Sequence, residues 1–126
     1  MKSTAAQSCR IVVSGSRLFR EVLQRALSLV PGLEVVGEAV GLEDLRHIID
    51  WQGPQWLIVP FVPYDKIPEA IESLLIKYPF LSVLAVAVDG SQVQTRGTRL
   101  RAEETFKDLS FDDMVCILHA GSYRDD

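Results

Sequence analysis

The sequence is poor in the residue types that build metal sites and disulfide frameworks. It has only two cysteines and two histidines in 126 residues. Cys9 and Cys116 lie far apart, neither belongs to a CxxC pair, and His47 and His119 are not clustered with them. Zinc modules and small disulfide-stabilised domains need closely spaced sets of these residues. The sequence therefore predicts two reduced thiols, no metal site and no bound cofactor.

An excess of basic residues and a long apolar segment are also missing. The 13 Lys and Arg against 17 Asp and Glu give a net charge of -4, which argues against bulk attraction to nucleic acid or anionic lipid. The apolar runs are shorter than the ~20 residues of a membrane helix, and the opening MKSTAAQSCR has no hydrophobic centre of a signal peptide. We therefore expect a cytoplasmic protein that neither enters a membrane nor binds nucleic acid directly.

The sequence does contain strand-like and helix-like patterns that alternate over a length that suits one domain. With 48% hydrophobic residues, the chain can form one core, which we expect to span about residues 9–121 of a single domain. Short apolar runs alternate with amphipathic segments of about ten residues, a pattern typical of parallel sheets covered by helices on both faces. This predicts a doubly wound α/β fold with a parallel sheet. The expected strands cover 10–13, 33–39, 56–59, 81–88 and a short stretch at 105–106, and the expected helices cover 17–30, 43–50, 67–77 and 111–120.

Several helix boundaries have their own signals. Ser16 offers an N-cap hydroxyl, and Pro31-Gly32 ends the first helix. Ser110, with Asp113 three residues later, resembles a capping box for the last helix, which Gly121 is expected to close. The spacing of the apolar residues in the first helix predicts a single buried face made of Leu18, Phe19, Val22, Leu23, Ala26, Leu27 and Val30. Both tryptophans, Trp51 and Trp56, are expected in or at the edge of the core.

The pattern fails between residues 89 and 104, where a fourth helix is doubtful. The stretch DGSQVQTRGTRLRAEE has few apolar residues and no helical stripe. A frayed helix, a loop, and a short hairpin turning at Arg96-Gly97 remain open, the hairpin because VQT and TRL alternate at period two.

Four stretches carry a family resemblance: SRLFREVLQRALSLVPGLEVVGEAVG, PQWLIVP, YPFLSVLAVAV and FKDLS. Together they resemble the receiver domain of bacterial two-component response regulators, most closely the subgroup with a helix-turn-helix DNA-binding output domain. The resemblance covers about residues 9–121 and is weakest between 89 and 104. It implies a flavodoxin-like three-layer α/β/α fold with five parallel strands.

The resemblance also assigns positions to the family's phosphorylation site. The two acidic residues that hold Mg²⁺ correspond to Ser14 and Gly15, the phospho-acceptor aspartate to Pro60, and the Thr or Ser of the fourth strand to Ala87. Only the family's lysine after the fifth strand is kept, as Lys107. Without anionic partners Lys107 is more typical of a surface or loop-anchoring lysine.

The residues at these positions exclude the family's chemistry. Mg²⁺ prefers hard oxygen ligands that usually include carboxylates, and a proline ring carries no nucleophilic atom. The strand ends also show no nucleophile–base pair and no glycine-rich phosphate loop. We therefore expect a degenerate receiver, a pseudo-receiver that is not an enzyme.

Two functions follow from this interpretation. The first is a phosphorylation-independent module for dimerisation or protein binding in signal transduction or transcriptional regulation, since the family docks through its fourth helix, fifth strand and fifth helix. The alternative is a small-molecule sensor that uses the emptied pocket, with Phe61, Tyr64 and Tyr78 as lining residues. The candidate interaction residues are Arg96, Arg99, Leu100, Arg101, Asp112 and His119.

Overall fold

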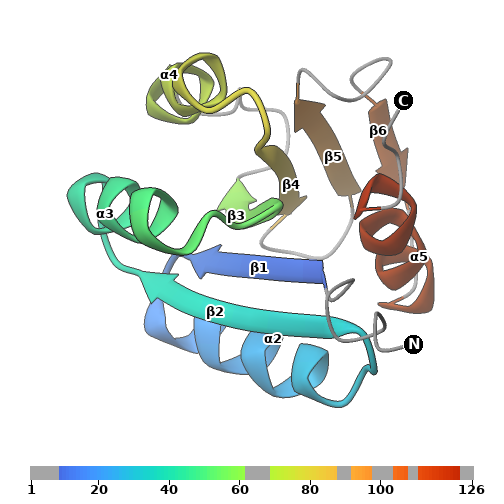
Figure 1. The fold of residues 1–126 in the computed structure, drawn as a ribbon. Helices are drawn as coiled ribbons and strands as arrows, with labels where there is room; N and C mark the ends of the chain where they lie inside the picture. The colour runs from blue at the N-terminus through green and yellow to red at the C-terminus, as the bar shows by residue number, and fades with distance from the viewer. Residues whose placement is uncertain (1–8, 62–68, 88–91, 98–103, 108–110, 123–126) are drawn as a thin grey trace, which may run out of the picture.

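The computed structural model describes residues 9–61, 69–87, 92–97, 104–107 and 111–122, which form one mixed sheet with helices on both faces (Figure 1). The strand order is β2-β1-β3-β4-β5-β6. The strands are β1 (Cys9–Ser14), β2 (Leu33–Ala39), β3 (Trp56–Phe61), β4 (Ser82–Ala87), β5 (Gln92–Gly97) and β6 (Glu104–Lys107), and the helices are α2 (Arg17–Ser28), α3 (Leu42–Gln52), α4 (Glu69–Lys77) and α5 (Phe111–Ser122).

The sheet differs from the five parallel strands that the sequence predicts. Strands β1 to β4 are parallel where they pair, but β5 lies antiparallel between β4 and β6. It occupies the segment whose structure the sequence left open. Its period-two pattern is used as a strand, because Val93 and Thr95 are buried while Gln92 and Gln94 are partly exposed. The prediction of five all-parallel strands is therefore wrong.

Of the three alternatives left open for this segment, a hairpin that turns at Arg96-Gly97 does not fit the structure. Arg96 pairs with Val83 and Gly97 with Ser82, so both residues belong to the ladder between β4 and β5. A side chain at Gly97 would approach the Ser82 Oγ to 3.0 Å and its Cα to 3.1 Å. Glycine therefore allows β5 to lie close against the start of β4.

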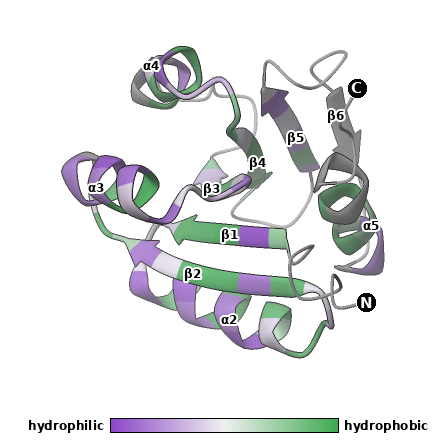
Figure 2. Ribbon diagram, viewed as in Figure 1, coloured by the Kyte–Doolittle hydropathy of each residue, from purple (hydrophilic) through white to green (hydrophobic). Residues whose placement is uncertain are grey.

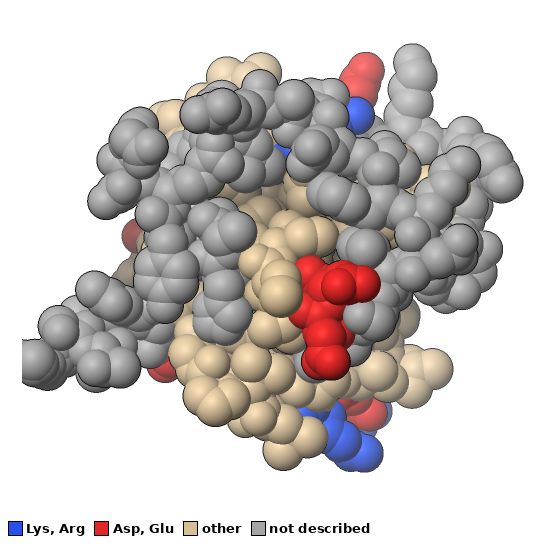
Figure 3. Space-filling view, turned by 90° about the vertical axis from the view of Figure 1, so that its right-hand side faces the viewer, with Lys and Arg blue, Asp and Glu red and all other residues tan. Residues whose placement is uncertain are grey.

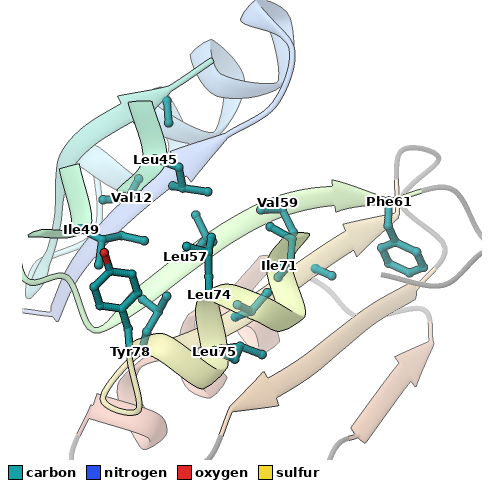
Figure 4. Close-up of a cluster of buried hydrophobic side chains, with 14 of the residues drawn as sticks. Val12, Leu45, Ile49, Leu57, Val59, Phe61, Ile71, Leu74, Leu75 and Tyr78 are labelled. Atoms are coloured by element: carbon teal, nitrogen blue, oxygen red, sulfur yellow. The ribbon is translucent and has the colours of Figure 1, made fainter. Parts of the chain in front are cut away.

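Two buried clusters lie on opposite faces of the sheet. One contains side chains from α3 and α4, and Figure 4 shows them converging on Val12, Leu57 and Val59. The other contains Leu23 and Leu27 of α2 with Met114 and Leu118 of α5. Successive strand residues point to opposite faces, and Figure 2 shows β1 hydrophobic along most of its length. The predicted three-layer α/β/α arrangement is confirmed, and it is compatible with a flavodoxin-like fold.

Helix α2 begins where the sequence predicts, but fewer of its apolar residues are buried than the sequence predicts. The Ser16 hydroxyl accepts a hydrogen bond from the Phe19 amide at 3.2 Å, which confirms the N-cap. The predicted buried face is partly wrong, because Leu18 is 71% exposed and Val22 is 57% exposed. Leu23 and Leu27 do pack against the sheet. The sheet therefore covers only one side of the wide apolar face of α2.

Two further expectations need correction. Helix α5 continues to Ser122, so Gly121 lies within the helix and does not close it. Trp51 on α3 is 79% exposed, whereas Trp56 at the start of β3 is buried. The Trp56 Nε1 donates a hydrogen bond to the Leu118 carbonyl oxygen at 3.1 Å, and this bond ties α5 to the sheet.

A buried tyrosine links the two helices on the other face. The Tyr78 hydroxyl, in the segment after α4, donates a hydrogen bond to the Asp50 carboxylate on α3 at 2.6 Å. This bond, followed by burial and the Asp50 charge, raises the pKa of Tyr78 above its ordinary value of 10.0. A raised pKa in the folded state means that the link stabilises the fold fully below pH 10 and is lost as the pH rises through the higher value.

The Asp50→Asn variant should therefore bring the pKa of Tyr78 back toward 10, because it removes the charge that opposes tyrosinate formation. NMR titration of ring-labelled tyrosine measures this change. Asp44→Asn, which removes an exposed acid from the first turn of the same helix, is the control and should leave the titration of Tyr78 unchanged. Equal effects of the two variants would contradict the assignment to the Asp50 hydrogen bond.

Candidate functional site

The candidate site lies where β1, β3 and β4 end. Ser14 is the last residue of β1, Pro60 lies in β3 and Ala87 is the last residue of β4. Parallel strands place their carboxyl ends at one edge of the sheet, where open α/β sheets generally bind ligands. The structure therefore brings the predicted positions 14, 15, 60 and 87 to the same edge.

Gly15 lies directly against the Pro60 ring. A Cβ atom at Gly15 would be 2.9 Å from both Cγ and Cδ of Pro60 and 3.0 Å from Cδ2 of Phe19. Gly15 also has a φ of +132°, in a region that residues with a side chain rarely adopt. Pro60 thus packs closely on Gly15. Its ring occupies the space beside the end of β1 that an acidic side chain at position 15 would need.

The residues that form this edge, Ser14, Gly15, Pro60 and Ala87, carry no charged side chain. Ala87 is buried, and Ser14 provides only a partly exposed hydroxyl. Across the residues that the structure describes, no three His, Cys, Asp or Glu side chains gather as a metal site would require. The predicted absence of a carboxylate pair at the ends of β1 and β3 follows from the residue types alone.

An arginine holds the loop after β1, and the sequence interpretation missed it. The Arg20 Nε donates a hydrogen bond to the Gly15 carbonyl oxygen at 3.1 Å, and Nη1 forms an ion pair with Glu38 of β2 at 2.9 Å. The Arg20 side chain is only 17% exposed. The sequence places Arg20 only on the polar side of α2. The path of the loop after β1 brings the Gly15 carbonyl oxygen within hydrogen-bonding distance of the Arg20 side chain.

Lys107 lies further from this edge than the family resemblance implies. It pairs with Gln92 of β5, and β5 separates it from β4. Neighbouring strands lie ~4.8 Å apart, so the Lys107 backbone is two spacings, or ~10 Å, from the β4 strand. The structure does not bring Lys107 beside Ala87, because an antiparallel strand lies between them. The Lys107 side chain is outside the part of the chain that the structure describes.

The predicted interaction residues are described only in part. Arg96 forms an ion pair with Glu72 of α4, so it is engaged within the fold and is not a free anchor. Asp112 is exposed in the first turn of α5. Figure 3 views the molecule from the α5 side and shows acidic side chains near the middle of that face. Arg99, Leu100 and Arg101, and the side chain of His119, lie outside the described residues.

The predicted lining of the emptied pocket is not gathered in one place. Phe61 lies near the end of β3, whereas Tyr78 lies beside Ile49 at the other end of the sheet (Figure 4). Tyr64 lies outside the described residues. The structure does have a depression of about 410 Å³, but it lies on the outer side of α2, and none of Ser14, Gly15, Pro60 or Ala87 lines it. The small-molecule sensor thus stays a prediction without a described cavity at the strand ends.

Comparisons with models of known protein families and with curated proteins found no match for this chain. Within the described part of the chain, no helix is both long and apolar enough to cross a membrane. Cys9 is buried and Cys116 is exposed, and the two are not joined by a disulfide.

Proposed function

We propose that this protein is a pseudo-receiver, a domain of receiver-like architecture that signals through protein contacts and is not phosphorylated at its strand ends. The order of the four parallel strands β2-β1-β3-β4, with α2 and α5 on one face and α3 and α4 on the other, supports the resemblance seen in the sequence. The context is signal transduction or transcriptional regulation, and the module has no catalytic activity of its own.

The packing of Pro60 against Gly15 carries the proposal. An aspartyl phosphate needs a carboxylate nucleophile and a Mg²⁺ ion held by oxygen ligands beside it. Here the acceptor position is a ring without a nucleophilic atom, and that ring lies 2.9 Å from the point where a side chain at position 15 would begin. An apolar contact between Pro60 and Gly15 thus stands where the family has its acceptor and metal ligands. The close fit of these two residues suggests that this edge of the sheet contributes to packing.

The inserted strand β5 supports the same conclusion. A lysine that is to act on a phosphoryl group must reach the pocket, but β5 moves the backbone of Lys107 one strand further from β4. The same strand occupies the place of the doubtful fourth helix, so the output face of this protein is built differently from the family's. A domain without a chemical switch transmits information only through what it binds.

The domain should not react with phosphodonors. Incubation with acetyl phosphate and Mg²⁺ should leave the intact mass unchanged, and beryllofluoride with Mg²⁺ should not shift the NMR signals of Ser14 or Gly15, because acceptor and metal ligands are absent. A receiver domain with an intact acidic pocket, treated in parallel, serves as the control that both reagents are active. A stable adduct of one phosphoryl group, or a Mg²⁺-dependent shift centred on Ser14, would refute the proposal.

A further inference from the structure

Helix α2 exposes a regular apolar stripe along one flank of the side that packs on the sheet. Leu18, Val22 and Leu29 are 71%, 57% and 81% exposed. Together with Arg25 they follow steps of four, three and four residues, which is the spacing of a helix-pairing seam. We call Leu18, Val22, Arg25 and Leu29 the outer stripe of α2.

The core of the protein does not explain this stripe. Leu23 and Leu27 already pack α2 against the sheet, in the cluster that includes Ile11 and Val13. The apolar face of α2 is thus wider than the part that packs on the sheet. The outer stripe lines the depression of about 410 Å³, to which Glu21 and Ala26 also contribute. An exposed apolar surface bordered by charges is typical of a protein contact.

The charged residues beside the outer stripe indicate which partner fits it. Two charged residues, Glu21 and Arg25, line the depression, one of each sign and four residues apart. Within the chain Glu21 also forms an exposed ion pair with Arg17 at 3.0 Å. In an antiparallel pair of α2 helices centred between positions 23 and 24, Leu18 faces the partner's Leu29, and Glu21 lies beside the partner's Arg25. In a parallel pair, each charge would face its own copy. The surface is thus self-complementary in the antiparallel arrangement.

We propose that a second copy of this chain docks on the outer stripe of α2, forming a symmetric antiparallel dimer. The inference deepens the proposed function, on which it rests, by naming the partner and the surface of the contact module. It differs from the contact surface predicted on the segment 89–104, where Arg96 is paired with Glu72.

The size of the surface sets the expected strength. The 12 residues of α2 span ~18 Å at 1.5 Å per residue. A contact confined to one helix pair is small beside the ~1,200–2,000 Å² of a stable interface. The dimer should therefore be weak, with a dissociation constant on the order of 10–100 µM.

Association of the full chain should be visible by sedimentation velocity between ~10 µM and ~1 mM, a range that brackets this constant. In the antiparallel register residue 22 faces the partner's Arg25, so Val22→Arg should weaken association at least tenfold, because it places two arginines opposite each other. Val22 is largely exposed, so the variant should keep the melting temperature and circular dichroism spectrum of the native protein. Gln24→Arg adds the same charge at an exposed position outside the stripe and should leave association unchanged.

Two results would overturn the proposal. One is a chain that stays monomeric throughout the concentration range. The other is a dimer that tolerates Val22→Arg but dissociates in the double variant Arg99→Glu, Arg101→Glu, which would place the contact on the segment 89–104. Both leave the phosphodonor test unaffected, so failure of the α2 dimer can be told from failure of the pseudo-receiver assignment.

Cross-linking tests the direction of the helices. In a Cys116→Ser background, which removes the exposed thiol, the pair Leu18→Cys, Leu29→Cys should form a disulfide-linked dimer under mild oxidation, because residue 18 faces the partner's residue 29. Leu18→Cys alone should remain largely monomeric. An efficient cross-link in the single variant would mean that the helices run parallel and would overturn the antiparallel arrangement.

Discussion

The Gly15→Asp variant should lose roughly 2–5 kcal/mol of unfolding free energy. Its Cβ would lie 2.9 Å from two atoms of the rigid Pro60 ring, and the backbone would hold a φ of +132° that aspartate tolerates poorly. Urea unfolding followed by circular dichroism measures the loss. The result would show that the acidic residue of a phosphorylation site cannot simply be returned to this position.

A double-mutant cycle separates the two causes. Pro60→Ala removes both Cγ and Cδ, the two ring atoms that the new Cβ would meet. We expect it to recover ~0.5–3 kcal/mol in the Gly15→Asp background, while the backbone strain and the Phe19 contact remain. No recovery would mean that the proline ring is not the obstacle.

Gly41→Asp is the matched control for the same substitution. Gly41 is the N-cap of α3, has a φ of -133° and has no neighbouring atom within 4 Å of the point where a Cβ would lie. Aspartate is a favourable N-cap residue. The variant should therefore be neutral or stabilised by up to ~1 kcal/mol, and a loss as large as that of Gly15→Asp would point to a general intolerance of acidic residues.

The Trp56→Ala variant should lose ~3–5 kcal/mol of unfolding free energy, the usual effect of truncating a buried aromatic side chain. Trp56 is 1% exposed and belongs to the cluster between the sheet, α2 and α5. Removing the indole leaves a cavity and deprives the Leu118 carbonyl of its donor at 3.1 Å. Urea unfolding with circular dichroism detection again measures the effect.

Two further tryptophan variants make the test specific. Trp56→Phe keeps most of the apolar volume and removes the hydrogen bond, so a smaller loss of ~1–3 kcal/mol is expected. Trp51→Ala should change stability by less than ~0.5 kcal/mol, because Trp51 is 79% exposed. Similar losses at the two tryptophans would contradict the burial that separates them.

The two tryptophans also show where sequence patterns are informative. Trp56 begins the apolar run WLIV, and a continuous apolar run in an alternating α/β chain indicates a buried strand. Trp51 lies in an amphipathic helix near its end, where a shift of one residue turns a side chain by ~100° around the axis. The pattern places the helix correctly but does not settle which side of it faces the sheet at that point.

The segment 89–104 was unpredictable for a related reason. Its stretch QVQTRG has one valine and one threonine at alternating positions, a signal too short to separate a strand from a loop. Strand β5 forms because β4 offers a free edge, and Val93 pairs with Val86 there. Pairing with a strand from elsewhere in the chain is a non-local interaction that period and propensity do not encode.

The sequence by itself determined the order of elements through β4 and the lack of a nucleophilic side chain at position 60, since both depend on residue types and local periodicity. A proline cannot accept a phosphoryl group in any fold. Only the tertiary structure decided that Gly15 packs on Pro60, that β5 separates Lys107 from β4, and that one apolar side of α2 remains outside. These features depend on contacts between residues that are far apart in the sequence, and those contacts decide which side chains are buried.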